Sequence, residues 1–292
     1  MFPGFETRDI ETSGARIRVR AGGEGPPLLL LHGYPQTSAM WRHVAPALAE
    51  RFTVVCPDLR GYGASSKPPS GTDCINYSKR EMARDQVEVM AALGHTRFGL
   101  AGHDRGGRVA HRLAADWPDR VTRLCVLDIA PTREMYRDAT DALARAYWHW
   151  FFLILPPPRP ERMIGADPDA FWREKCGDGP GGLEIFGEAL EEYLAAFRDP
   201  ETIRANCDDY RAAAGIDIAH DDADDSKLPM PLLCLWGAKG VIERCFDPLA
   251  LWRERAADVR GHALPCGHYM PEELPREITR ELAGFLGPDG DR

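Results

Sequence analysis

The chain has 292 residues, of which 44% are hydrophobic and 28% charged, and its formal net charge is −9. This composition is typical of a globular protein with a sizeable core, and it excludes disordered, collagen-like and coiled-coil chains. The negative charge argues against partners that need a basic face, so we expect no nucleic acid and no membrane partner.

The first half of the chain alternates short apolar runs with longer amphipathic stretches, which is the pattern of a mostly parallel sheet with helices on both faces. We predict strands at 27–33, 53–58, 97–102 and 123–128. Helix-like spacing predicts crossover helices near 40–50, 78–93 and 105–117.

No comparably strong strand pattern follows until residues 231–237, and the aromatic and helical patterns between them predict a helical insertion, or cap. A strand near 259–264 and a helix near 274–286 then complete the core. The predicted organisation is a first core part at 1–130, a cap at 131–228 and a second core part at 229–292.

The start of the chain lacks the basic and apolar segments of a targeting signal, and the longest apolar run is too short to span a bilayer. The eight cysteines form no C-x-x-C pair. We therefore expect a cytoplasmic protein with reduced thiols and no metal site.

The segment LAGHDRGGRVAHR at 100–112 places Asp104 between Gly102 and Gly106, where a predicted strand turns into a predicted helix. Such an elbow presents its middle residue at a helix N-terminus, which favours a carboxylate. A carboxylate with a pKa near ~4 is ionised at neutral pH, so it can attack a carbon atom without a base and form an ester. The alternative is that Asp104 only caps the helix.

The chain resembles the α/β-hydrolase fold through HGYP at 32–35, DLRGYGASSKP at 58–68 and GHDRGG at 102–107. Within that fold it is similar to the fluoroacetate dehalogenases, on the segments GHDRGGR, LDIAPT and ARAYWHW, and the similarity is weakest around 176–190. The resemblance implies a mostly parallel sheet with an inserted helical cap and hydrolysis of small haloacids, fluoroacetate included. It implies no metal or organic cofactor, and it suggests a homodimer.

Hydrolysis of the ester needs a base, and we predict His268, in PCGHYMPEE after the last strand. The acid that orients this histidine often stands near position 240 in the fold, where this chain has Gly240. Asp128, at the end of a predicted strand, is the predicted acid, and Glu243 is a weaker candidate. The alternatives are a structural loop histidine and an ordinary strand-end turn.

The backbone N–H groups of Tyr34 and Arg105 are the predicted donors to the oxyanion formed during ester hydrolysis. The side chains of Arg105 and Arg108 lie three residues apart on the first turn of the predicted helix, so both can hold a carboxylate beside Asp104. Either arginine could instead be a solvated surface residue, and we expect Arg112 to face solvent.

By resemblance, His149, Trp150 and Tyr210 form the pocket for the leaving halide. From the residues alone, the aromatic run would be a helical core stripe. Adjacent residues on a regular helix diverge by ~100°, so two neighbours that reach one ion imply an irregular backbone there.

Three other functions are alternatives. An epoxide hydrolase uses the same aspartate and needs acidic donors from the cap, which Tyr147, Tyr193 and Tyr210 can supply. The paired arginines disfavour it, and likewise a haloalkane dehalogenase, because a neutral substrate gives them no partner. A non-catalytic receptor of this fold would have a damaged triad, whereas all three triad residues are present here.

Overall fold

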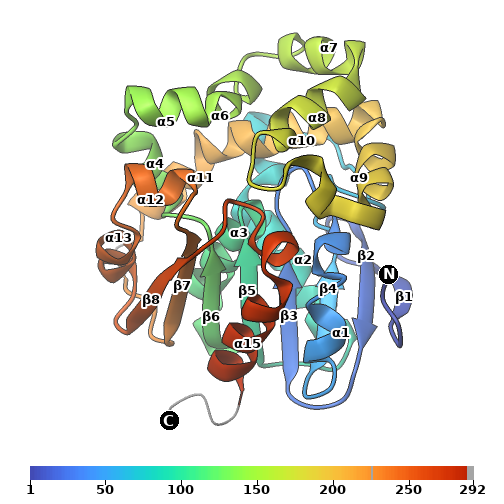
Figure 1. Cartoon of the computed structure of the whole chain (residues 1–292), viewed down its shortest axis with the longest axis vertical. Helices are drawn as coiled ribbons and strands as arrows, with labels where there is room; N and C mark the ends of the chain where they lie inside the picture. The colour runs from blue at the N-terminus through green and yellow to red at the C-terminus, as the bar shows by residue number, and fades with distance from the viewer. Residues whose placement is uncertain (225, 288–292) are drawn as a thin grey trace.

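The computed structural model of the chain describes residues 1–224 and 226–287. Its centre is an 8-stranded sheet in the order β1-β2-β4-β3-β5-β6-β7-β8 (Figure 1). Strands β4, β3, β5, β6, β7 and β8 are parallel to their neighbours in this order. At one edge, β1 pairs antiparallel with β2, and β2 pairs antiparallel with β4. The strands are β1 (Glu6–Glu11), β2 (Arg16–Gly22), β3 (Pro27–Leu31), β4 (Thr53–Pro57), β5 (Phe98–His103), β6 (Val121–Leu127), β7 (Leu232–Gly237) and β8 (Val259–Leu264).

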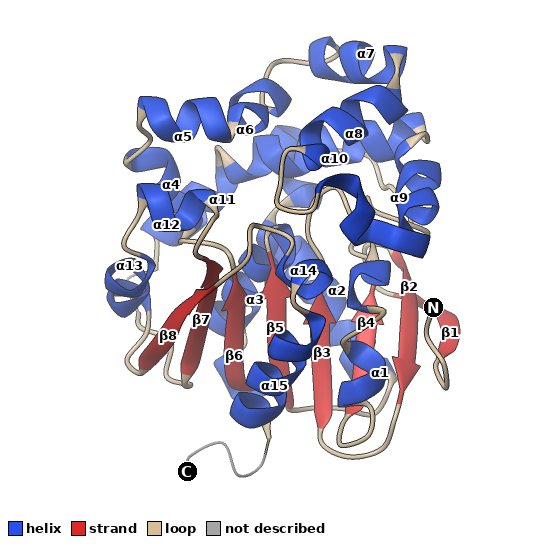
Figure 2. Cartoon of the chain, in the orientation of Figure 1, coloured by secondary structure: helices blue, strands red, loops and turns tan. Residues whose placement is uncertain are grey.

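Helices cover both faces of the sheet, with α1 and α15 in front of it and α2 and α3 behind it in Figure 2. Helix α2 begins at a Ser78 cap, whose hydroxyl accepts the Glu81 N–H. The helices that flank the sheet are η1 (Ser38–Trp41), α1 (Ala45–Leu48), η2 (Thr72–Tyr77), α2 (Lys79–Ala92), α3 (Arg105–Asp116), η3 (Pro118–Arg120), α12 (Val241–Cys245), α13 (Pro248–Arg255), α14 (Met270–Glu273) and α15 (Pro275–Leu286).

A second group of helices lies over the carboxyl ends of the parallel strands (Figure 1). In the described part of the chain no strand interrupts this group between β6 and β7. We keep 131–228 as the predicted bounds of the cap. Its helices are α4 (Thr132–Arg137), α5 (Asp141–Ala146), α6 (Trp148–Leu153), α7 (Arg159–Ala166), α8 (Pro168–Gly177), η4 (Gly182–Ala189), α9 (Leu190–Phe197), α10 (Pro200–Ala213) and α11 (Ile216–Asp222).

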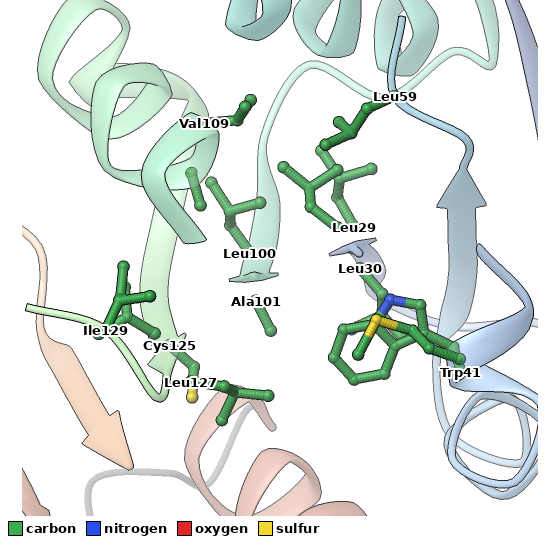
Figure 3. Close-up of a cluster of buried hydrophobic side chains, with 14 of the residues drawn as sticks. Leu29, Leu30, Trp41, Leu59, Leu100, Ala101, Val109, Cys125, Leu127 and Ile129 are labelled. Atoms are coloured by element: carbon green, nitrogen blue, oxygen red, sulfur yellow. The ribbon is translucent and has the colours of Figure 1, made fainter. Parts of the chain in front are cut away.

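The core fills both sides of the central strands because helices cover both faces. Leu29 of β3 lies near Leu100 and Val109 on one side, and Leu30 points to Trp41 on the other (Figure 3). All five side chains are fully buried. A strand that is buried on both faces needs a continuous apolar run, which explains why the central strands were visible in the sequence.

The structure confirms the predicted fold class, and each of the six predicted strands is present within two residues of its expected bounds. Strands β1 and β2 were not predicted, because β1 is an edge strand with a single buried residue, Ile10. The helix expected near 40–50 is two short pieces, η1 and α1. Among the described residues, no helix combines the length and the apolar character needed to cross a membrane.

Candidate active site

Asp104 occupies the sharp turn between β5 and α3, with φ 47° and ψ −116°. This conformation is strained for a residue with a side chain, at a cost of roughly 1–3 kcal/mol. The turn can close only because its flanking residues are small: a Cβ on Gly102 would lie 2.4 Å from the Gly106 oxygen, and one on Gly106 would lie 2.3 Å from the His32 oxygen. The side chain makes no capping hydrogen bond to α3, which argues against a simple capping role.

The two carboxylate oxygens of Asp104 face different groups. Oδ1 accepts a hydrogen bond of 2.9 Å from the Tyr34 backbone N–H, and Oδ2 lies 4.0 Å from Nε2 of His268. Burial raises the pKa of Asp104, but electrostatic interactions with His268, His103, Arg105 and Arg108 outweigh it and leave the pKa lowered. Asp104 is therefore an anion at neutral pH, although it is only 4% exposed.

His268 lies in the loop after β8, and its Nδ1 is 2.6 Å from Oδ2 of Asp128. Asp128 follows the last residue of β6, and its Oδ1 accepts the Gly237 N–H at 2.9 Å. This second bond fixes the carboxylate, which in turn orients the imidazole. The geometry therefore groups Asp104, His268 and Asp128 as the sequence predicts.

Position 240 and Asp128 converge on the same place in the fold. A Cβ built on Gly240 would lie 3.4 Å from Oδ1 of Asp128. Glu243, the weaker candidate for the acid, instead accepts a hydrogen bond from the indole N–H of Trp236. Asp128, which follows β6, therefore places its carboxylate where the side chain of a residue at position 240 would also lie.

The side chain of Arg105 is fully buried and is held by Asp209 of α10. Nε donates to Oδ2 at 3.0 Å, and Nη2 donates to Oδ1 at 2.7 Å and to the Asp209 backbone oxygen at 2.9 Å. Lys79 and the Tyr62 hydroxyl also contact the Asp209 carboxylate. The third guanidinium nitrogen, Nη1, is buried and has no hydrogen-bond partner in the described residues, so it can bind a substrate carboxylate.

Arg108 is 3% exposed, so it is not a surface residue either. Its Nη1 donates to the Ala130 oxygen at 3.1 Å and to the Thr132 hydroxyl at 2.9 Å, and its Nε has no partner in the described part of the chain. The expectation that Arg112 faces solvent is wrong, because it is 4% exposed and pairs with Asp116 at 2.9 Å.

His149, Trp150 and Tyr210 lie against one another and against the arginines. The Tyr210 ring centroid is 5.8 Å from that of His149 and 6.2 Å from that of Trp150. The Arg105 guanidinium lies 4.1 Å from the centroid of Tyr210, and that of Arg108 lies 4.6 Å from the centroid of Trp150. The irregular backbone expected at His149 and Trp150 is not found, because both lie within the helix α6; the break in the helical backbone comes earlier, at Tyr147, which separates α5 from α6.

Each of these three side chains carries a buried polar atom without a partner in the described residues, namely Nδ1 of His149, Nε1 of Trp150 and the Tyr210 hydroxyl. Burial lowers the pKa of His149 and raises that of Tyr210, so the first is neutral and the second stays protonated at neutral pH. An indole N–H and a protonated phenol are both hydrogen-bond donors, so an anion can bind to them.

The tyrosines that an epoxide hydrolase would need have different hydrogen-bond partners in this structure. The Tyr193 hydroxyl donates to Glu272 at 2.6 Å, whereas the Tyr147 hydroxyl lies 3.5 Å from Nδ1 of His268.

Within the described residues there is no group of three or more His, Cys, Asp or Glu side chains placed to hold a metal ion.

Sequence reasoning missed Asp209, which holds Arg105, and Lys79, which shares its carboxylate. The only signal was the position of Asp209 beside Tyr210, and a lone acid on a predicted helix does not indicate a buried partner.

Comparisons with known proteins agree with this geometry. Residues 26–175 match the family described as alpha/beta hydrolase fold. A fluoroacetate dehalogenase from Burkholderia sp. is 48% identical over 98% of this chain and 95% of its own length, and a soluble epoxide hydrolase from Corynebacterium sp. strain C12 is 36% identical over 94% and 95%. The crystal structure of a provisionally assigned alpha/beta hydrolase from Nostoc sp. PCC 7120 has a TM-score of 0.96 and 54% identity, covering 99% of this chain and all of its own. The chain is therefore a member of the α/β-hydrolase family and a relative of the Burkholderia fluoroacetate dehalogenase.

Proposed function

We propose that this protein hydrolyses haloacetates, fluoroacetate included, to glycolate, halide and a proton through an ester on Asp104. The observation that carries the proposal is the set of unpartnered buried donors near this aspartate, on Arg105, Arg108 and the three aromatic residues of the halide pocket. A buried donor without a partner costs about 1–3 kcal/mol, so several at one place indicate a site that a ligand completes. Two guanidinium groups fit a carboxylate, and the neutral donors beside them fit a halide.

In the first step, the guanidinium groups of Arg105 and Arg108 hold the substrate carboxylate. Oδ2 of Asp104 attacks the carbon that bears the halogen, the carbon–halogen bond breaks, and the electron pair leaves with the halide. His149, Trp150 and Tyr210 donate hydrogen bonds to the departing ion. Because attack and departure occur on opposite sides of the carbon, we expect inversion with a chiral substrate.

In the second step, His268 removes a proton from a water molecule, which attacks the carbonyl carbon of the Asp104 ester. Negative charge then develops on Oδ1, the oxygen that already accepts the Tyr34 N–H. The Arg105 N–H is the second proposed donor to this oxygen. Asp128 stabilises the imidazolium, which gives its proton to the departing glycolate oxygen as the tetrahedral intermediate collapses. The carboxylic acid left on Asp104 then releases a proton to solvent, which restores the carboxylate and gives the proton of the overall reaction.

The test is halide release from fluoroacetate and chloroacetate, with an epoxide as the parallel substrate, by wild type and by Asp104→Asn. We expect wild type to release halide from both haloacetates and to leave the epoxide unopened, and the variant to release none. Opening of the epoxide without halide release would favour the epoxide hydrolase. Binding without turnover of any of the three substrates would favour a receptor.

The resemblance also supports a homodimer in the cytoplasm. Analytical ultracentrifugation of the purified chain tests the dimer, and a mass close to the 32.5 kDa of a single chain would contradict it.

A further inference from the structure

A cleft of ≈ 300 Å³ opens beside the candidate site. It lies between the cap and the core, bordered by residues of α5, α8 and α12, whose positions can be followed in Figure 1. His268 and Tyr147 form part of its wall. The His268 side chain is 19% exposed, whereas that of Asp104 is 6% exposed. His268 is thus the more solvent-accessible of the two, and the cleft reaches the site beside it.

Basic side chains outnumber acidic ones along this cleft. Lys175, Lys239, Arg244 and Arg145 line it, together with one acid, Asp178. Arg145 is already engaged in an ion pair within its own helix. The other three form no ion pair with any residue that the structure describes, so the lining carries excess positive charge on a chain whose formal net charge is −9.

The charge of Lys175 also acts inside the site. Its Nζ lies 6.0 Å from the ring centroid of Tyr269, the neighbour of His268. Burial is the main cause of the lowered pKa of His149, and the charge of Lys175 is the next largest. An amine at the wall of the cleft is therefore close enough to influence the halide pocket.

We propose that this cleft is the entrance of the site, and that Lys175, Lys239 and Arg244 concentrate carboxylate anions there before the buried arginines bind them. The inference rests on the proposed function, because only an anionic substrate gains from it. Charges of one sign along a cleft raise the local concentration of counter-ions, and exposed charges are screened over ~10 Å at 0.1 M salt. The three cations therefore act locally, on an anion that enters the cleft.

The test reverses two charges of the cleft in the variant Lys239→Glu/Arg244→Glu. Both side chains are exposed, so the fold should persist, and circular dichroism checks this. The matched control is Arg51→Glu/Arg97→Glu, which makes the same change in net charge at two exposed positions just before β4 and β5, at the opposite edge of the sheet. Chloride release from chloroacetate is measured at several ionic strengths set with sodium sulfate.

At low ionic strength we expect KM of the cleft variant to rise roughly five- to tenfold with kcat nearly unchanged, for charges on the order of 10 Å from the bound anion. The neutral pair Lys239→Gln/Arg244→Gln should show about half of this effect on a logarithmic scale. High ionic strength should bring both variants close to wild type, and the control should keep the wild-type KM throughout.

A wild-type KM in the cleft variant, an equal rise in the control, or a rise that persists at high ionic strength would overturn the inference. A wild-type protein that releases no halide from any haloacetate would instead contradict the proposed function, and with it the substrate class on which the inference depends.

Discussion

Asp209 is the residue whose replacement tests most directly how the proposed carboxylate site is built. It lies on α10, and its carboxylate and backbone oxygen hold the Arg105 guanidinium through three hydrogen bonds. Both side chains are fully buried. In Asp209→Asn, Arg105 keeps the backbone bond and one amide oxygen but loses its charged partner, and Lys79 loses one as well.

Breaking a buried ion pair by removing one partner costs about 3–5 kcal/mol, so we expect the free energy of unfolding to fall by roughly 3 kcal/mol in a variant that retains one acceptor. A less firmly oriented guanidinium should also lose one charge-assisted hydrogen bond to the substrate, about 1.5–3 kcal/mol, which raises KM roughly 10- to 150-fold. We expect kcat to fall less, because Asp104, His268 and Asp128 keep their mutual contacts.

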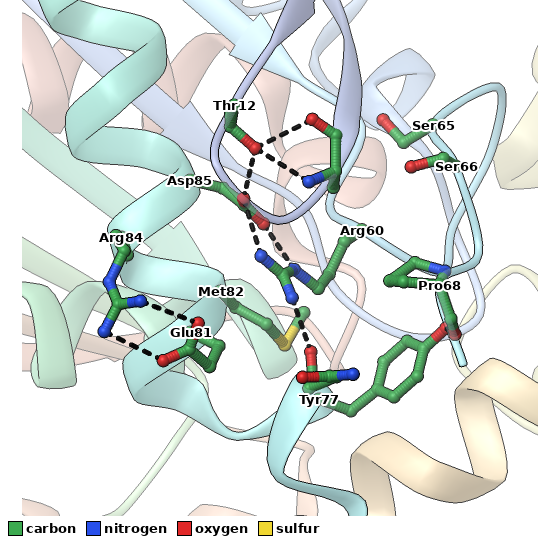
Figure 4. A network of polar contacts seen from close by, with 12 residues as sticks. Thr12, Arg60, Ser65, Ser66, Pro68, Tyr77, Glu81, Met82, Arg84 and Asp85 are labelled. Atoms are coloured by element: carbon green, nitrogen blue, oxygen red, sulfur yellow. Dashed lines mark hydrogen bonds and ion pairs between the residues drawn. The ribbon is translucent and has the colours of Figure 1, made fainter. Parts of the chain in front are cut away.

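The control is a buried ion pair of the same type that lies away from the site. Arg60 and Asp85 have side chains that are each 2% exposed, and Nη2 of Arg60 donates to Oδ1 of Asp85 at 2.7 Å (Figure 4). We expect Asp85→Asn to lose a similar free energy of unfolding while KM stays at the wild-type value. Urea unfolding monitored by circular dichroism and chloride release from chloroacetate supply the two measurements.

The removal of Asp209 also leaves more positive charge near the substrate, which by itself would lower KM. We expect orientation to dominate, since a carboxylate needs the unpartnered Nη1 of Arg105 at a defined position. An unchanged or lowered KM in Asp209→Asn, or an equal rise in Asp85→Asn, would refute the positioning role.

The pH dependence of stability gives an independent check on the same residue. Burial raises the pKa of Asp209, but the charges of Arg105 and Lys79 lower it by more than burial raises it. The folded-state pKa is therefore below the ordinary 3.8. A lowered folded-state pKa means that the carboxylate stabilises the protein above the unfolded pKa and that this stabilisation is lost as the pH falls. The difference in unfolding free energy between wild type and Asp209→Asn should therefore be full at neutral pH and shrink below about pH 4.

Three further predictions concern the proposed reaction. In His268→Ala the ester cannot be hydrolysed, so mass spectrometry should find a stable adduct on Asp104 after one turnover, and an unmodified chain would contradict the scheme. Asp128→Asn should lower kcat by roughly 10²- to 10⁴-fold while Glu243→Gln stays near wild type, and the reverse order in steady-state assays would exchange their roles. Tyr210→Phe removes a donor from the halide pocket and should slow fluoroacetate roughly tenfold more than chloroacetate, since fluoride depends more on hydrogen bonds; equal losses with both substrates would count against the pocket.

The parts of the site that sequence reasoning could find are those set by local chain geometry. The elbow around Asp104 needs small residues at fixed offsets. The acid follows β6, whose apolar run reads as a buried strand, and the base follows the last strand, β8, in which only Leu264 is buried. Parallel strands end at one edge of a sheet, so side chains that follow several strands are expected to meet there.

The parts that could not be found depend on contacts between distant segments. Arg105 and Asp209 are 104 residues apart, and no spacing rule connects an arginine on one helix with an acid on another. Arg112 was expected in solvent, because the pattern of α3 gives no sign that Asp221 of α11 covers it with an ion pair of 3.4 Å. The basic cleft could not be predicted either, because its lining comes from cap and core segments that are distant in the sequence. The net charge of the chain gives no sign of it, since it averages over the whole surface.

The two arginines of the site are not equivalent, although they look alike in the sequence. The charge of Arg105 is compensated by Asp209, whereas the recorded partners of Arg108 in the described chain are a carbonyl, a hydroxyl and a sulfur. Burial and the nearby Arg105 both lower the pKa of Arg108, which marks it as the uncompensated cation of the site.

This difference determines how charge is balanced during the proposed reaction. Before attack, Arg108 faces two anions, Asp104 and the substrate carboxylate. Once the ester forms, Asp104 is neutral, the substrate carboxylate remains with Arg108, and the displaced negative charge resides on the halide. The groups proposed to receive that halide are neutral, because burial keeps His149 uncharged and Tyr210 protonated. The arginines can therefore set affinity for the acid, while the choice between fluoride and heavier halides falls to neutral hydrogen-bond donors, whose strength depends on close placement.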